Sequence, residues 1–195
     1  MRDSEHGSRM TAVRSVLLQS SLDELKHLGH FERYLTFMDP VAFEELSGLV
    51  IGPGWIPAEL ALKHYAACDA MLLTHEQLEA MGTRVSARLH STLLVTVARS
   101  MSNTLGGDPW TFMGPLTRLA GRVFQGTRAE IIKLGPKDMR IDVRGNTLFQ
   151  FQYYRVAYSA SLRARFTGFG ARIVYVKFAP YNEDNAFMAV RVSWA

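Results

Sequence analysis

His64 and Cys68 are the two side chains whose types and spacing come nearest to a reactive pair. They are four residues apart in a segment with helical periodicity, so both project from one apolar helix face. A thiol beside an imidazole can act as a nucleophile with its base, but a third group must orient the base, and Asp69 points to another face. One Cys and one His also fall short of a tetrahedral zinc site. We therefore interpret Cys68 as a buried thiol.

His90 is the second histidine expected on an apolar helix face. A buried imidazole must bond to a carbonyl, a hydroxyl, water, a metal or a cofactor. Three readings stay open for both histidines: a core residue bonded internally, a ligand of haem iron, or a polar group in a pocket for an organic molecule. We expect a ligand-binding site with polar groups from His64, Tyr65 and His90, and with Cys68 and Trp55 beside them.

Motifs that specify an enzyme class do not occur in the sequence. It has no glycine-rich phosphate loop, no Gly-x-Ser-x-Gly elbow and no His-Glu-x-x-His zinc helix. The carboxylate pairs Glu44-Glu45 and Glu183-Asp184 are adjacent in sequence, so we interpret both as solvated surface. The sequence predicts no catalytic residue and no metal site, it leaves the cofactor open, and it favours a protein that is not an enzyme.

The composition suits a soluble, ordered chain of 195 residues, 48% of them hydrophobic. Its lone cysteine and its polar N-terminus favour a cytoplasmic location, and no apolar run is long enough to span a membrane. Residues 1–116 hold 9 Lys and Arg against 13 Asp and Glu, whereas residues 117–195 hold 13 against 5. The basic second part could meet an anionic partner, but no run of Lys or Arg exceeds two residues, which argues against nucleic acid.

The order of the elements predicts an α+β fold. We expect a disordered tail at 1–12 and one domain at 13–195, with a helical part at 13–125 and a sheet-containing part at 126–195. In the second part a hairpin at 130–143 precedes a helix at 151–166 and a second hairpin at 172–194. This hairpin-helix-hairpin order predicts a small antiparallel sheet packed against the N-terminal helices.

Local signals predict the boundaries of the helices. Ser21 and Glu24 fit a capping box that opens a short helix, and Asp39-Pro40 opens another. A longer helix is expected to begin at Trp55-Ile56-Pro57 and end near Leu73. Gly82 is expected to interrupt the helix after it, before a helix at 83–101. A final helix is expected at 110–125.

Several short motifs resemble those of a family of uncharacterised bacterial proteins best known from myxobacteria. They are Trp55-Ile56-Pro57 before a helix, Ala80-Met81-Gly82, Gly135-Pro136 in a hairpin, the glycines at 168–170 and the closing Arg191-Val192-Ser193-Trp194. The same layout is similar to the broader group that contains the 4-vinyl reductase domain and the haem nitric-oxide-binding domain. That resemblance implies a ligand-binding or regulatory module with a helical N-terminal region and an α/β part.

Two features of that broader group are missing. The sequence has no Cys or His after His90, so the metal-binding cluster of many 4-vinyl reductase domains is absent. The Tyr-x-Ser-x-Arg haem-propionate motif is also absent, since Tyr158-Ser159-Ala160-Ser161 lacks its spacing and its arginine. The resemblance therefore does not carry haem over to this chain.

The leading functional hypothesis is a non-enzymatic sensory or regulatory module that binds an apolar or amphipathic small molecule. Two alternatives stay open. One is an enzyme with a scattered active site that uses His64 or His90, and the other is an interaction protein that forms a homodimer.

Overall fold

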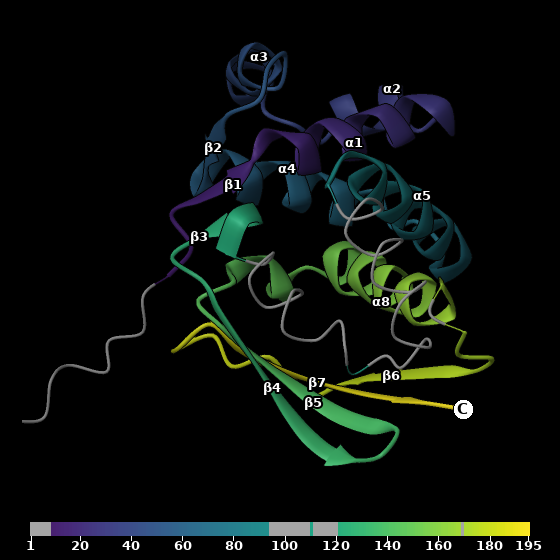
Figure 1. The fold of residues 1–195 in the computed structure, drawn as a ribbon. Helices are drawn as coiled ribbons and strands as arrows, with labels where there is room; N and C mark the ends of the chain where they lie inside the picture. Colours follow the sequence, from purple (N-terminus) through teal and green to yellow (C-terminus); the bar gives the residue numbers. More distant parts are fainter. Residues whose placement is uncertain (1–8, 94–109, 111–120, 169) are drawn as a thin grey trace, which may run out of the picture.

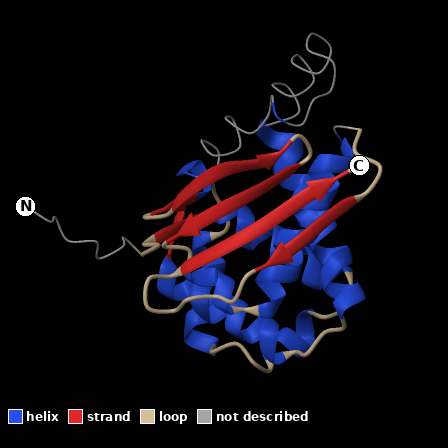
Figure 2. Ribbon diagram, turned by 90° about the horizontal axis from the view of Figure 1, so that it is seen from below, coloured by secondary structure: helices blue, strands red, loops and turns tan. Residues whose placement is uncertain are grey.

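The computed structural model describes residues 9–93, 110, 121–168 and 170–195. A four-stranded sheet forms one layer, and helices cover one of its faces (Figure 1). Figure 2, turned by 90°, shows the other face of this sheet without a covering helix among the described residues. The α+β class predicted from the sequence is confirmed.

The N-terminal part is mainly helical. Its elements are β1 (Ala12–Arg14), α1 (Ser15–His27), α2 (Phe31–Leu35), α3 (Pro40–Leu49), β2 (Trp55–Pro57), α4 (Ala58–Ala70) and α5 (His75–Leu93). Asp39 caps α3 as predicted, because its Oδ1 accepts a hydrogen bond from the Ala42 amide. Thr74 and Gln77 exchange the two hydrogen bonds of a capping box at the start of α5.

The second part contains β3 (Phe124–Gln125), β4 (Arg128–Gly135), β5 (Asp138–Arg144), the 3₁₀ turn η2 (Thr147–Gln150), α8 (Gln152–Gly168), β6 (Val174–Phe178) and β7 (Phe187–Trp194). The four long strands are antiparallel in the order β4-β5-β7-β6. Successive residues of a strand point to opposite faces of the sheet, and the buried side of β7 consists of Met188, Val190, Val192 and Trp194.

A second, smaller sheet joins the two parts of the chain. β1 pairs antiparallel with β2 on one side and with β3 on the other, so that Val13 lies opposite Ile56 and Phe124. Met10, just before β1, is buried, and its amide donates to the Gly145 carbonyl. This three-stranded sheet was not predicted, because each of its strands is only two or three residues long.

α5 and α8 pack closely against one another. An added Cβ at Gly82 would lie 2.4 Å from the Ala157 Cα, so only glycine allows the helices to approach this closely. Near this contact the Ser161 hydroxyl donates to the Ser86 hydroxyl at 3.1 Å. The prediction that Gly82 interrupts the helix is therefore wrong, since α5 runs through it.

Three other predicted boundaries differ from the structure. α1 begins at Ser15 rather than at a capping box, and Ser21 lies in its buried middle. Trp55–Pro57 is a strand, and the helix begins only at Ala58. The helix expected at 110–125 falls largely outside the described residues, but its end is the strand β3.

In the part of the chain that the structure describes, no helix combines the length and the apolar character needed to cross a membrane.

Candidate functional site

α4 places three of the predicted site residues together in the core. His64, Tyr65 and Cys68 lie on its inner side, and His64 is fully inaccessible to solvent while Cys68 is 1% exposed. The outer side of the same helix carries Glu59 and Lys63, which form an exposed i,i+4 ion pair. The amphipathic pattern of α4 therefore directs one imidazole and the only thiol of the chain into apolar surroundings.

Both ring nitrogens of His64 are engaged by hydroxyl groups. Nδ1 lies 3.0 Å from the Tyr34 hydroxyl, and Nε2 lies 3.0 Å from the Ser21 Oγ. The Ser21 Oγ in turn lies 2.9 Å from the Tyr153 hydroxyl. We call these four residues the buried hydroxyl–imidazole chain. It joins α2, α4, α1 and α8, and each of its members is satisfied by a neighbour.

Burial controls the charge state of the imidazole. Desolvation lowers the pKa of His64 to about 3, because a cation in this buried position has no solvent to stabilise it. His64 is therefore neutral at physiological pH. In that form one ring nitrogen donates and the other accepts, which matches two hydroxyl partners that can do either.

Cys68 touches the same chain of groups. Its Sγ lies 3.7 Å from His64 Nε2. Burial raises the pKa of the Cys68 thiol well above its usual value, although a hydrogen bond from Tyr153 opposes this shift. A buried, protonated thiol is a poor nucleophile, so the arrangement disfavours the Cys–His pair as a reactive centre.

Aromatic rings surround the polar groups on the side of α8. The Tyr65 ring lies with its centroid 5.0 Å from that of His64 and 5.3 Å from that of Tyr154. Tyr65 is also stacked on Phe151. The Tyr154 hydroxyl accepts a hydrogen bond from Asn146 Nδ2 at 3.2 Å. The result is a mostly aromatic junction with a few fixed polar groups.

A long-range carboxylate fixes the start of α8 beside this junction. Asp69, at the end of α4, accepts hydrogen bonds from the Gln152 amide at 2.9 Å and the Tyr153 amide at 2.6 Å. These amides belong to the first turn of α8 and have no partner within the helix. Asp69 points to another face than His64, as expected, and it acts as a cap rather than as a member of a catalytic group.

The two other predicted site residues lie elsewhere. Trp55 is on β2, half-buried, with the Arg14 guanidinium 4.1 Å from its ring centroid. His90 is on α5, but its side chain lies outside the described residues, so its role stays a prediction.

Sequence reasoning missed three members of the buried chain: Ser21, Tyr34 and Tyr153. One signal could have found Ser21, since it is four residues after Leu17 and four before Leu25 on the apolar face of α1. No comparable signal marks Tyr34, because α2 has only five residues. Tyr153 is one of many aromatic residues late in the chain, and nothing in the sequence distinguishes it from the others.

Solved structures share the fold over nearly the whole chain. The Fe(II) unliganded H-NOX protein from K. algicida is 9% identical, with a TM-score of 0.64 over 93% of this chain and 96% of that one. A mutant of it reaches a TM-score of 0.67 at 8% identity, over 93% and 96% of the two chains. The fold is that of the H-NOX proteins.

A third similar structure is reported as "Modulating Heme Redox Potential Through Protein-Induced Porphyrin Distortion", with a TM-score of 0.56 at 11% identity. It is matched over 92% of this chain and 99% of that one. Neither a protein-family model nor a curated protein sequence matches the chain.

The described histidines do not fit a haem iron. Both nitrogens of His64 are bonded to hydroxyl groups, so no lone pair is left for a metal. His27 is exposed and His30 only half-buried, and the exposed His75 pairs with Glu79. Among the residues that the structure describes, no group of three or more His, Cys, Asp or Glu side chains is placed to hold a metal ion.

Proposed function

We propose that the protein is a non-enzymatic sensory or regulatory module that binds an apolar or amphipathic small molecule. The observation that carries this proposal is the buried hydroxyl–imidazole chain inside an aromatic junction. A binding pocket of this kind needs apolar walls and a small number of oriented polar groups. The junction offers both, because Tyr65 and Tyr154 supply aromatic faces and His64 is a neutral imidazole.

The fold gives independent support. The similar structures are H-NOX proteins, and one of them comes from work on the redox potential of haem, which is a large and mostly apolar group. A fold that holds such a group in those proteins is suited to hold a flat or elongated apolar molecule in this one. Fold likeness at about 10% identity carries no residue roles, so the ligand class rests on the side chains of the junction.

The proposed contacts are His64, Tyr65 and Cys68, with His90 and Trp55 as further predicted contacts from α5 and β2. His64 is already bonded at both nitrogens, so a ligand that reaches it must replace the Tyr34 or the Ser21 hydroxyl. Such a replacement would loosen α2 or α1 from α4. Binding and helix position would then be coupled, which is what a sensor requires: the ligand must favour one arrangement over the other.

The enzyme alternative receives less support. A catalytic group must meet its substrate in an open cleft with its partner groups. His64 and Cys68 are together, but burial keeps the Cys68 thiol protonated and makes the His64 imidazole a weak base, so neither side chain is activated for catalysis.

The test combines native mass spectrometry of gently purified protein with added hemin, iron-free protoporphyrin IX and palmitate. We expect a co-purified small-molecule mass or a rise in Tm with at least one of the three. The described histidines do not fit iron, so tighter binding of hemin than of protoporphyrin IX would point to His90 as an iron ligand.

The control variant is Tyr175→Phe, which removes an exposed hydroxyl on β6 and should leave binding unchanged. Tyr65→Phe removes a hydroxyl in the junction and should weaken binding of the same probe. A protein with no co-purified mass, and with no response to any of the three molecules, would overturn the proposal.

A further inference from the structure

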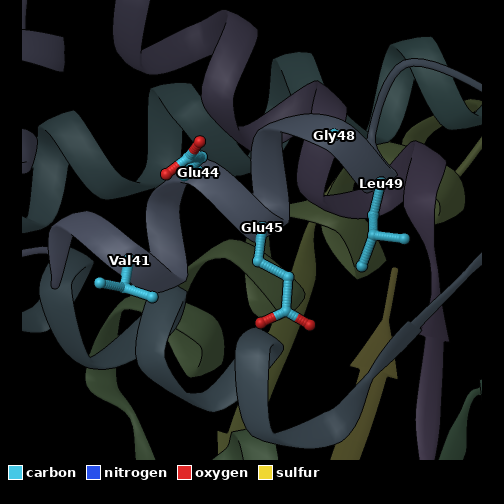
Figure 3. Close-up of a pocket in the computed structure, with 5 residues that line it drawn as sticks. All are labelled: Val41, Glu44, Glu45, Gly48 and Leu49. Carbon is cyan, nitrogen blue, oxygen red and sulfur yellow. The ribbon is translucent and has the colours of Figure 1, made fainter.

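The outer surface of α3 exposes apolar side chains next to two carboxylates. Val41 is 74% exposed and Leu49 is 38% exposed, and both lie beside Glu44, Glu45 and Gly48 in one shallow depression (Figure 3). We call these five residues the α3 face. An added Cβ at Gly48 would meet no atom within 4 Å, so the surface is open above the helix.

α3 exposes apolar side chains on its outer side in addition to those that it buries on its inner side. Its inner side is buried through Ala42 and Leu46, with Phe43 half-buried. A helix on the surface of a globular protein normally has a polar outer side. Exposed apolar residues also continue at the two ends of the helix in sequence, with Phe37 at 46% and Ile51 at 84% exposed. The exposed apolar side chains of the α3 face make it a candidate interaction surface.

The charged residues in the stretch of sequence that holds α3 have one sign. The sequence contains no Lys or Arg from Tyr34 to Leu62, while it contains Asp39, Glu44, Glu45 and Glu59 in that span. Glu44 and Glu45 form no ion pair with any other described residue, whereas Glu59 pairs with Lys63. The two carboxylates of the α3 face are therefore available to a cation from outside the chain.

We propose that the α3 face is the docking surface for a basic, amphipathic segment of a partner protein. The apolar side chains of such a segment would cover Val41 and Leu49, and its Lys or Arg residues would pair with Glu44 and Glu45. α3 has ten residues and is therefore about 15 Å long, which matches two to three turns of a partner helix. Anchors at positions i, i+4 and i+7 of that helix would reach along the face.

Charge argues against two other occupants. A phospholipid surface is negative, so Glu44 and Glu45 would repel it. On a second copy of this chain, Arg140 and Arg191 on the outer side of the four-stranded sheet are already paired with Asp142 and Asp138, so they are not free to pair with Glu44 and Glu45. That sheet lies on the opposite side of the molecule from α3 (Figure 1), so pairing would be head-to-tail and would build an open chain of copies.

The experiment measures fluorescence anisotropy of a labelled synthetic helical peptide with leucine at i, i+4 and i+7 and lysine at the flanking positions. A matched peptide has glutamate in place of lysine. We expect the lysine peptide to bind the wild-type chain, and the glutamate peptide to bind at least about tenfold more weakly.

Variants locate the binding. Double substitution of Glu44→Lys and Glu45→Lys should weaken binding of the lysine peptide by roughly tenfold or more, since two ion pairs become repulsive contacts. Val41→Ser with Leu49→Ser should also weaken it, at unchanged charge. The matched controls are Glu130→Lys, an exposed acid on β4, and Leu134→Ser, an exposed apolar residue on the same strand. Both controls should stay within about twofold of the wild type.

Two results would overturn the proposal. One is equal binding of the lysine peptide to wild type and to both α3 variants, with circular dichroism showing that the variants are folded. The other is a wild-type dimer or larger assembly in sedimentation velocity that dissociates in the Val41→Ser, Leu49→Ser variant, because the occupant of the face would then be a second copy.

Discussion

His64 Nε2 lies 3.0 Å from the Ser21 Oγ, and this contact joins α4 to α1 across 43 residues of sequence. The same imidazole reaches α2 through Tyr34. One buried side chain therefore fixes the relative position of three helices. A buried polar group that loses its hydrogen-bond partner destabilises the folded state. Substitution of His64 should therefore give a measurable change in the free energy of unfolding.

Substitution of His64→Leu should lower the free energy of unfolding by about 2 to 4 kcal/mol, because the buried Tyr34 hydroxyl loses its partner and the Ser21 hydroxyl loses one of two. Urea denaturation measures this change. His75→Leu serves as the control, since His75 is exposed and its pair with Glu79 lies on the surface. The control should change stability by no more than about 0.5 kcal/mol. Equal effects of the two substitutions would contradict the role given to the buried chain.

Stability should fall as the pH is lowered from 7 to 5. The pKa of His64 is about 3 in the folded protein, below the usual value of 6.5, so the unfolded chain binds the proton first. Between these two values each pH unit should cost about 1.4 kcal/mol, which amounts to roughly 2 kcal/mol at pH 5.

The comparison variant for this pH dependence is His64→Gln, which keeps a side chain able to donate and accept but cannot be protonated in this range. Its urea midpoint should change less between pH 7 and 5 than that of the wild type. An identical pH profile for the two proteins would show that His64 is not the group responsible.

Gly82→Ala should destabilise the protein, although alanine is the better helix former. The added Cβ would lie 2.4 Å from the Ala157 Cα, so α5 and α8 would have to separate at a cost of about 1 to 3 kcal/mol or more. Gly48→Ala is the matched control, because it is also helical and its Cβ would meet nothing within 4 Å. That substitution should stabilise by roughly 0.5 to 1 kcal/mol. Thermal unfolding of the two variants should therefore shift in opposite directions.

Asp69→Ala should cost about 1 to 2 kcal/mol, because the Gln152 and Tyr153 amides lose their acceptors. Hydrogen exchange should become faster at these two amides. Asp39→Ala is the comparison, since it removes a cap of similar strength from α3 and should affect the Ala42 amide instead. Unchanged exchange at Gln152 and Tyr153 in the Asp69→Ala variant would contradict this role.

The sequence was informative where local pattern and final environment agree. Met188 and Val190 are two residues apart on β7, and this spacing predicts that both are buried. In a sheet with one covered face, every second side chain of a strand points into the core. Asp39-Pro40 predicted the start of α3, because a helix cap is an interaction between residues close in sequence. The grouping of His64, Tyr65 and Cys68 on one side of α4 also followed from helical spacing.

Prediction failed where a tertiary contact overrides a local signal. Ser21 and Glu24 have the spacing of a capping box, yet both are buried inside α1, and Glu24 pairs with Arg88 of α5. Gly82 has the type of a helix breaker, but α5 continues through it. The close approach of α8 leaves no room for a side chain at this position. The partner of Ser21, Tyr153, is 132 residues away, and a local signal does not encode a pairing at that separation.

The three-stranded sheet has a consequence for synthesis of the chain. β1 at residues 12–14 leaves the ribosome early, but its neighbour β3 at residues 124–125 is made about 110 residues later. At ordinary elongation rates this delay is roughly 5 to 20 s. Throughout that time one edge of β1 is unpaired and can hydrogen-bond to another nascent chain. Folding of the N-terminal helices before translation is complete should therefore depend on how well β2 and the helices shield this edge.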